Sequence, residues 1–551
     1  MNPLFQKIRL ESDTAELNPL LEPDRKAVLT VYGISRDGTE EEIAPQQVRF
    51  SITTLLTNGD QEAAAVSKDG IVTPLAGGYV RVEASYIGVG HGLTASVKLV
   101  IRPFYHEYHK TLVYKLFLAM EPWKPHPDAE GGTERDSSVY MDFAQAEDII
   151  RRIDNMTVGM PKICYLVGWQ TGGHDHLYPA FNEVNPRLKR KEDPNARESL
   201  RRLIRKGPEY HTTVSLHINL IDAYSNSPLW EEYREKHLLK EETDGSVQYY
   251  SDFPELDGTG VRMANVVQSR LLESGEFEKR FNELFELLPE LADTHTVHID
   301  NWRADPCPSI GITQEGEEKA LKQMFLRLRE RGLDVTSEGN FHGRREPMTG
   351  LQPMSWWGIP YHPSVIPPSL YCGGRAGRSD SDPRFGDSIH IEDLVRENLE
   401  RGYDPCDGIF EEFALYVLTW QYLNSHTLQE FDGETAFYSG GVKAGLENGV
   451  PVIREGDTLI RFGTTLFIPM LWKPDREIFY YSFRESVFNF RLPESWRDVK
   501  AVDLYYVDRT GRADPKPEKI AFDTRHGSLT MNARGRTAYI IKPHDHDKEE
   551  E

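Results

Sequence analysis

The strongest constraint on the fold of this chain is an alternation of strand-like and helix-like segments between residues 105 and 430. Short apolar runs typical of buried strands include VYKLFLAM, KICYLVGW, TTVSLHINL, HTVHIDNW and LDVTSEG. Segments such as FAQAEDIIRRIDNM and EEKALKQMFLRLRERG have the spacing of amphipathic helices. Because strands that alternate with helices form parallel sheets, and because no GxGxxG motif follows a strand, this region is predicted to form a (β/α)8 TIM-like barrel.

Two regions rich in short strands flank the predicted barrel. Residues 1–104 contain runs such as KAVLTVYGI, QVRFSITT and GYVRVEASY, separated by Gly, Asn and Asp turns. Residues 431–545 contain further strand-like runs, among them TLIRFGTTLFIPMLW and RTAYIIKP, and residues 546–551 form a charged tail expected to be disordered. We therefore predict a multidomain α/β plus β protein, with the barrel at 105–430 and a β sandwich on each side.

The composition and net charge limit the classes of molecule that this chain is expected to bind. The chain has 551 residues, enough for several domains, and a net charge of -23 that repels polyanions. A neutral carbohydrate substrate is therefore favoured, and a nucleic-acid partner is not expected. No run of about 18 apolar residues predicts a membrane span, and no secretory signal is recognised, so a cytoplasmic location is expected. Four cysteines without a CxxC pair argue against a zinc ribbon or a disulfide-stapled fold; the oligomeric state is left open.

Two carboxylates stand at the carboxyl ends of predicted barrel strands. Asp300 closes HTVHID and Glu338 closes LDVTSE, 38 residues later, about one strand-loop-helix-strand unit. On neighbouring strands they would share one rim, as the nucleophile and the proton donor of a retaining glycosidase do. The competing interpretation is that each carboxylate caps a helix or pairs with an arginine. The context HIDNWR favours catalysis, since Trp302 could stack on a sugar and Arg303 could hold a carboxylate ionised or bind a hydroxyl.

The loop GWQTGGHDHLYP is the first candidate for substrate binding. It gathers Trp169, Gln170, His174 and Asp175, a mixture of aromatic, amide, imidazole and carboxylate groups suited to sugar hydroxyls. Core packing is the alternative for Trp169, and a hydrogen bond to a backbone carbonyl is the alternative for His174.

Two further segments are candidates for substrate binding. His217 and Asn219 face the same side of TTVSLHIN, because side chains alternate along a strand. They contact the substrate or form a buried structural pair. In MSWWGIPYHP, Trp356 and Trp357 offer stacking faces for a sugar ring, with one of the two expected in the core.

Four motifs in the same order resemble the catalytic domains of the endo-α-N-acetylgalactosaminidases of glycoside hydrolase family 101 and the related α-N-acetylgalactosaminidases of family 129. They are GWQ…GHD, SLHIN, HIDNW and TSEG. The resemblance covers roughly residues 105–430. It implies that Asp300 matches the nucleophile of the family, Glu338 its acid/base residue and Asp175 the aspartate that binds substrate hydroxyls. Separately, DGIVTPLAGGYVRVEASY in the N-terminal region resembles bacterial immunoglobulin-like domains.

The resemblance implies a retaining glycoside hydrolase that releases α-linked N-acetylgalactosamine, with or without attached galactose, from O-glycan-type substrates. The loop reads GGHDHLYP without the expected serine after the aspartate, and NWRADP departs from the usual residues, so a different sugar is an alternative. An inactive carbohydrate-binding protein is a third interpretation. The compact chain favours exo action. No cofactor is required, no EF-hand loop or HExxH is found, and a structural calcium held by scattered Asp and Glu oxygens is left open.

Overall fold

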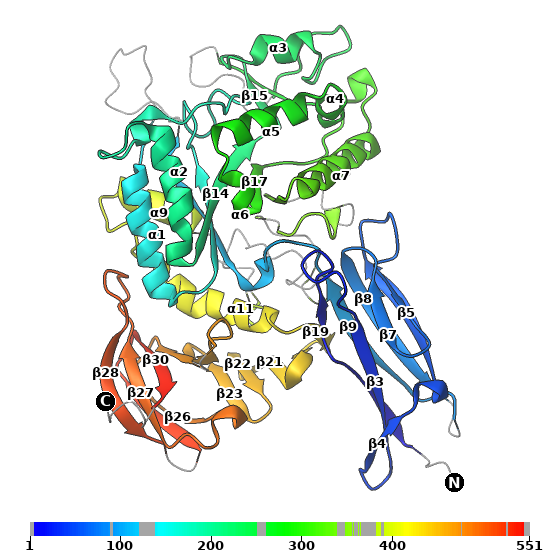
Figure 1. The fold of residues 1–551 in the computed structure, drawn as a ribbon. Helices are drawn as coiled ribbons and strands as arrows, with labels where there is room; N and C mark the ends of the chain where they lie inside the picture. Colours follow the sequence, from blue (N-terminus) through cyan, green and yellow to red (C-terminus); the bar gives the residue numbers. More distant parts are fainter. Residues whose placement is uncertain are drawn as a thin grey trace.

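The computed structural model describes residues 5–88, 92–120, 138–250, 261–338, 348–354, 356, 362, 364, 382–386, 391–474, 477–524 and 527–544. These residues form an α/β unit and two β domains. In Figure 1 the N-terminal β domain (blue) and the C-terminal β domain (orange to red) both lie below the α/β unit (cyan to yellow-green).

The N-terminal region is a β sandwich. One sheet has the order β1-β3-β7-β6 with β4 beside β3, and the other has the order β2-β9-β8-β5. Both sheets contribute to one apolar core, and buried residues alternate with more exposed ones along β3. The strands are β1 (Lys7–Ser12), β2 (Glu16–Leu17), β3 (Ala27–Ile34), β4 (Glu40–Ile43), β5 (Val48–Leu56), β6 (Ala64–Val66), β7 (Ile71–Pro74), β8 (Gly78–Tyr86) and β9 (Thr94–Ile101). The likeness to immunoglobulin-like domains stays a prediction.

The α/β unit is built on a parallel sheet with the order β10-β13-β14-β17-β18. Its strands are β10 (Leu112–Phe117), β13 (Lys162–Val167), β14 (Thr212–Asn219), β17 (Thr296–Asp300) and β18 (Asp334–Ser337). They are buried almost throughout, as expected for parallel strands covered on both faces.

Helices separate these strands, which confirms the predicted strand-helix alternation. They are α1 (Phe143–Thr157) before β13, α2 (Ala196–Lys206) before β14, α3 (Trp230–Glu235), α4 (Gln268–Glu273), α5 (Glu276–Leu287) and α6 (Leu291–Thr294) before β17, and α7 (Gln314–Glu330) before β18. Helix α1 begins at a capping box in which Asp142 accepts two backbone N–H groups and Gln145 bonds back.

The central sheet has five parallel strands within the described residues, so closure into an eight-stranded barrel stays a prediction. After β18 the described chain continues with α9 (Glu392–Glu400), α10 (Ile409–Glu412), a π-helical turn (Phe413–Val417) and α11 (Leu418–Asn424). None of the described helices is both long and apolar enough to cross a bilayer.

In the part of the C-terminal domain that the structure describes, one ten-stranded sheet carries a two-stranded sheet, β26-β29, on one face. It begins at β19, slightly before the predicted boundary of 431. The strands are β19 (Leu428–Phe431), β20 (Ala436–Tyr438), β21 (Val442–Glu447), β22 (Val450–Glu455), β23 (Thr458–Phe462), β24 (Thr465–Pro469), β25 (Ile478–Ser482), β26 (Ser486–Arg491), β27 (Ala501–Tyr506), β28 (Lys516–Asp523), β29 (Ser528–Ala533) and β30 (Thr537–Pro543). The other face of the large sheet joins the apolar core of the α/β unit.

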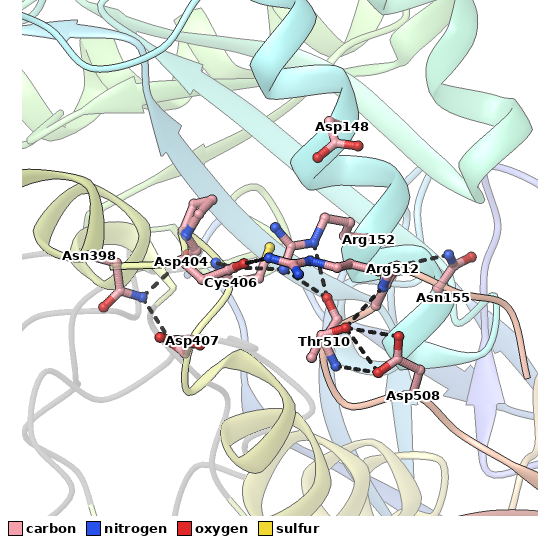
Figure 2. A network of polar contacts seen from close by, with 12 residues as sticks. Asp148, Arg152, Asn155, Asn398, Asp404, Cys406, Asp407, Asp508, Thr510 and Arg512 are labelled. Atoms are coloured by element: carbon pink, nitrogen blue, oxygen red, sulfur yellow. Dashed lines mark hydrogen bonds and ion pairs between the residues drawn. The ribbon is translucent and has the colours of Figure 1, made fainter. Parts of the chain in front are cut away.

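A buried arginine fastens the C-terminal domain to α1, as Figure 2 shows. Arg152 donates to Asp404 Oδ1 at 2.6 Å and to the carbonyl oxygen of Thr510 at 2.8 and 3.0 Å. Asn155 donates to the carbonyl of Gly511 at 2.9 Å, one turn further along the helix. Gly511 has φ +65°, and a Cβ there would meet the Arg152 carbonyl oxygen at 2.2 Å, so glycine permits this close approach.

Arg152→Met is expected to lower the free energy of unfolding by about 2–4 kcal/mol, because it removes the charged hydrogen bonds that the buried guanidinium donates to Asp404 and to the Thr510 carbonyl. Chemical denaturation measures the change. The matched control is Arg151→Met on the same helix, whose exposed pair with Asp148 contributes at most about 1 kcal/mol. Equal losses in the two variants would contradict the anchoring role of Arg152.

Candidate active site

The carboxyl ends of β14, β17 and β18 bring the two predicted catalytic carboxylates together. Asn219 lies opposite Asp300 in the β14–β17 pairing, and His217 lies opposite His298. In the β17–β18 pairing Ile299 lies opposite Ser337, so the next residues on the two strands are Asp300 and Glu338. The prediction that they share one rim is therefore consistent with the strand register.

Asn219 fixes the surroundings of Asp300. Its side-chain oxygen accepts the backbone N–H groups of Ile221 and Asp222, at 2.9 and 2.8 Å. The amide nitrogen therefore faces the carboxylates, and donates to Asp300 Oδ2 at 3.2 Å and to Asp222 Oδ2 at 2.6 Å. His217 Nε2 lies 3.4 Å from the same oxygen of Asp300. Asp300 is thus a buried carboxyl group that accepts a hydrogen bond from the neutral amide of Asn219 and has the His217 imidazole close by.

Glu338 contacts a buried cation. Lys115, in the middle of β10, is fully buried, and its Nζ donates to Glu338 Oε1 at 2.5 Å. The same Nζ lies 4.5 Å from the centroid of the Trp356 ring. Trp356 is only 2% exposed, so it serves this ammonium group rather than offering a free face to a sugar.

The loop after β13 folds back over the strand ends. Gly168 has φ +71°, and a Cβ at this position would meet the carbonyl oxygen of Ala119 at 1.8 Å. Because only glycine fits there, the chain can turn so that His174 N–H donates to that carbonyl at 2.9 Å. His174 Nδ1 lies 3.1 Å from the Tyr178 hydroxyl, and Nε2 lies 3.4 Å from Asp175 Oδ2. A ring nitrogen of His174 and a carboxyl oxygen of Asp175 each lie within 4.8 Å of an Asp300 carboxyl oxygen, so both residues reach the same site.

Two carboxyl groups beside Asp300 hold protons more tightly than usual. Burial, together with the negative charges of Asp300 and Glu338, raises the pKa of Asp175 well above its ordinary value. Burial and the charges of Asp300 and Asp175 raise the pKa of Asp222 to about 7. A protonated Asp175 can both donate and accept hydrogen bonds, which suits it to sugar hydroxyls.

The buried imidazoles of the site are neutral at neutral pH. Burial, with the charge of Lys115 next in importance, lowers the pKa of both His217 and His298 well below the ordinary value. His298 Nδ1 contacts the Thr336 hydroxyl at 2.8 Å. The ring centroids of His217 and His298 lie 5.1 Å apart. These imidazoles can donate or accept hydrogen bonds without adding positive charge.

The raised pKa of Asp222 predicts a pH-dependent stability. Between the ordinary value of 3.8 and the folded value of about 7 the folded protein binds more protons than the unfolded chain, so stability falls as pH rises through this interval. Asp222→Asn cannot ionise and is expected to lack this decline, gaining stability relative to the wild type between about pH 5 and pH 8. Urea unfolding at several pH values measures the difference.

The control for this prediction is Asp305→Asn. Burial opposes ionisation of Asp305, but the contact with Lys240 lowers its pKa below the ordinary value. Its contribution is therefore lost only in more acidic solution, and its effect on stability is expected to stay constant between about pH 5 and pH 8. A constant effect of Asp222→Asn over the same range would contradict the prediction.

Two tryptophans predicted to bind sugar lie in the core instead. Trp169 is fully buried and donates from Nε1 to the His217 carbonyl at 3.0 Å. Trp302 is 4% exposed, stacks on Phe277 and donates to Gln268 Oε1 at 2.7 Å. In both cases the indole is large enough to fill the space behind a strand end, and the polar N–H finds an internal partner.

Of three other residues predicted to bind the substrate, two contact neighbouring protein groups and one lies outside the described residues. Gln170 is 1% exposed and donates to the Gly173 carbonyl at 2.5 Å, so it shapes the loop. Arg303 Nη2 lies 3.6 Å from Asp305 Oδ2, and its charge opposes the raised pKa of Asp222. Trp357 lies outside the described residues.

Three residues of the site were missed from sequence. Lys115 interrupts the apolar run VYKLF, which was a signal, because a lysine within a buried strand needs a partner. His298 stands two residues before Asp300 and so shares its face of β17. Asp222 lies beyond the end of β14, and only the turn at Asn219 brings it beside Asp300.

Groups of ligand atoms close enough to hold a metal ion occur at three places in the described residues. They are His174-His217-Asp300, Asp175-Asp222-Asp300 and Glu16-Glu107-His109, with the candidate ligand atoms of each within 4.8 Å of one another. The first two share Asp300. In the third group, Arg102 and Lys110 form ion pairs with Glu16 and would compete with a metal ion for its carboxylate.

Comparison with known proteins gives one family match. Residues 136–348 match the model of glycoside hydrolase family 101, described as endo-alpha-N-acetylgalactosaminidase. This segment contains both Asp300 and Glu338. No match is found among curated protein sequences.

Several solved structures have a distant likeness. The α-N-acetylgalactosaminidase NagBb from Bifidobacterium bifidum, in a complex with GalNAc, is 12% identical with a TM-score of 0.45, over 77% of this chain and 73% of that chain. The maltogenic amylase from S. marinus is 10% identical with a TM-score of 0.39, over 94% and 80%. The α-amylase from Geobacillus thermoleovorans is 10% identical with a TM-score of 0.38, over 79% and 99%.

Proposed function

Since residues 136–348 form a glycoside hydrolase segment of the family 101 type, we propose that this enzyme releases α-linked N-acetylgalactosamine, with or without attached galactose, from O-glycan-type substrates. The reaction is a double displacement that retains the anomeric configuration. Asp300 is the nucleophile and Glu338 is the acid/base residue.

The observation that carries this proposal is the position of Asp300 and Glu338 at matching ends of two adjacent parallel strands. Adjacent strands lie about 4.8 Å apart. Retaining glycosidases need a carboxyl separation of about 5–5.5 Å, whereas inverting enzymes need roughly 6.5–9.5 Å to admit a water molecule. Carboxylates on neighbouring strands at the same level therefore favour the retaining reaction.

In the first step an Asp300 oxygen bonds to the anomeric carbon while Glu338 gives its proton to the departing glycosidic oxygen. In the second step water attacks the anomeric carbon, Glu338 accepts a proton from that water, and the bond to Asp300 breaks. Asn219 Nδ2, at 3.2 Å from Asp300 Oδ2, keeps the nucleophile oriented through both steps.

Neighbouring groups bind the sugar in this proposal. Asp175 hydrogen-bonds to substrate hydroxyls, in a protonated form favoured by its raised pKa. His174 and His217 contribute imidazoles whose ring centroids lie 5.0 Å apart, and that of His217 is neutral because burial lowers its pKa. The mechanism uses carboxyl groups and water, and we propose that it needs no cofactor; a structural calcium remains a proposal without assigned ligands. A cation on Asp300 would compete with its attack on the sugar.

The test is a panel of nitrophenyl glycosides with the purified full chain. Hydrolysis of the α-N-acetylgalactosaminide or of its galactosyl-β-1,3 disaccharide analogue, with an α-configured first product by NMR, is the expected result. Turnover of another glycoside alone would preserve the mechanism but overturn the sugar assignment. Sugar binding without any turnover would favour a carbohydrate-binding protein.

A further inference from the structure

Lys115 occupies a position that a lysine rarely holds. It lies in the middle of β10, opposite Tyr165 of β13, and is fully buried. Tyr165 is in turn opposite Ser215 of β14, and both bond to Thr296 of β17. Lys115 extends away from this cross-strand row to Glu338, which follows β18. A buried ammonium group is costly unless it is paired, and Glu338 supplies the paired carboxyl group here.

Charged and titratable groups face Glu338 from four elements. Lys115 comes from β10, Asp175 from the loop after β13, His217 from β14 and Asp300 from β17. His217 is neutral because burial and Lys115 lower its pKa. Among the described residues, Lys115 is the one cation with an ion pair to Glu338.

This balance bears on the two roles of an acid/base residue. Glu338 must carry a proton when the glycosidic bond breaks and must be ionised when water attacks. While Asp300 is a free carboxylate, its charge helps Glu338 to keep a proton. Once Asp300 is bonded to the sugar, that charge is gone and the ammonium of Lys115 remains. The same lysine then favours the base form of Glu338.

We propose that Lys115 is the positioning residue of Glu338: its ammonium group orients the carboxyl and favours the ionised form required in the second step. The inference rests on the proposed function. The ring of Trp356, whose centroid lies 4.5 Å from Nζ, adds a cation–π contact that holds the same ammonium group in place.

The experiment compares Lys115→Met with the wild type in the pH dependence of kcat and kcat/KM on a nitrophenyl glycoside that the wild type hydrolyses. Loss of the neighbouring cation is expected to move the alkaline limb of the pH profile of kcat/KM to higher pH, by about one pH unit or more. It is also expected to lower kcat at least about tenfold, because a protonated Glu338 cannot activate water. The glycosyl-enzyme should accumulate as a burst of nitrophenol, and azide, which needs no base, should restore turnover.

Tyr165→Phe is the matched control, because it removes a buried hydroxyl from the same cross-strand row without touching Glu338. Its pH profile is expected to overlay that of the wild type. The inference is overturned if the limb of Lys115→Met stays in place, whatever its loss in kcat, or if Tyr165→Phe moves the limb equally.

A second variant, Lys115→Gln, covers a folding failure of Lys115→Met, because it also removes the charge but keeps a hydrogen-bond donor for Glu338; the same move of the alkaline limb to higher pH is expected, and an unmoved limb would overturn the inference. A further measurement tests whether Lys115 acts through Glu338. In a Glu338→Gln background the ion pair is already absent, so adding Lys115→Met is expected to leave azide-rescued turnover unchanged within about twofold. A further tenfold loss would show that Lys115 acts independently of Glu338 and would overturn the inference. If the wild type hydrolyses no glycoside, the proposed function itself is wrong. If the wild type is active but the alkaline limb of the Lys115→Met profile is unchanged, only the proposed role of Lys115 is wrong.

Discussion

Asp300→Asn is expected to reduce kcat/KM on every glycoside that the wild type cleaves by at least about a thousandfold, because removing a covalent nucleophile removes the reaction path itself. The amide oxygen can still accept the Asn219 hydrogen bond, so the fold should be retained. Initial rates, with circular dichroism to verify folding, measure the effect. Asp154→Asn is the control: its carboxylate is similarly buried, at 14% side-chain exposure against 10%, and pairs with Lys162 away from the site.

The anomer formed with an external nucleophile tests the role of Asp300 more sharply. In Asp300→Gly, azide can enter the space left by the carboxylate and attack from the face opposite the leaving group, giving a β-glycosyl azide from an α-linked substrate. Retention of wild-type rates in Asp300→Asn would exclude this residue as the nucleophile.

Glu338→Gln is expected to slow cleavage by an amount that depends on the leaving group. A glycoside with a poor leaving group, such as a serine-linked sugar, needs the proton and should lose about 10²–10⁴-fold in kcat/KM, whereas a dinitrophenyl glycoside should lose much less. Azide should then accelerate turnover of the dinitrophenyl glycoside and give an α-glycosyl azide, because it attacks the glycosyl-enzyme from the side normally taken by water.

The control for Glu338 is Glu290→Gln. Its carboxylate has nearly the same side-chain exposure, 12% against 11%, but pairs with Arg201 outside the site. Its rates are expected to be independent of the leaving group. If Glu338→Gln loses activity equally on good and poor leaving groups, another residue supplies the proton, and Asp175 is a candidate because its pKa is raised.

The two catalytic variants and the Lys115 proposal are connected by the same ion pair. Glu338→Gln removes the carboxylate that Lys115 contacts at 2.5 Å and leaves a buried ammonium group without it. Loss of stability in this variant therefore reports the cost of that buried charge, while the leaving-group dependence reports proton transfer. The two readouts separate structure from chemistry in one variant.

The sequence by itself determined the strand-helix alternation of the central region and the two carboxylates at its strand ends. These follow from local periodicity, and matching ends of adjacent parallel strands must meet, as the register of Ile299 with Ser337 illustrates. The sequence could have identified Lys115 as a charged residue within a buried strand, but it could not have identified Glu338 as its partner. The contact with Glu338 joins residues 223 positions apart.

Only the tertiary structure decided which aromatic residues face the site and which fill the core. Trp169 and Trp302 stand in motifs rich in polar residues, yet both point into apolar packing and hydrogen-bond internally. Asp222 joins the carboxylates only because Asn219 turns the chain back on itself. Burial and the distances between charges depend on the whole fold, so the proton affinities of Asp175 and Asp222 could not be read from the sequence.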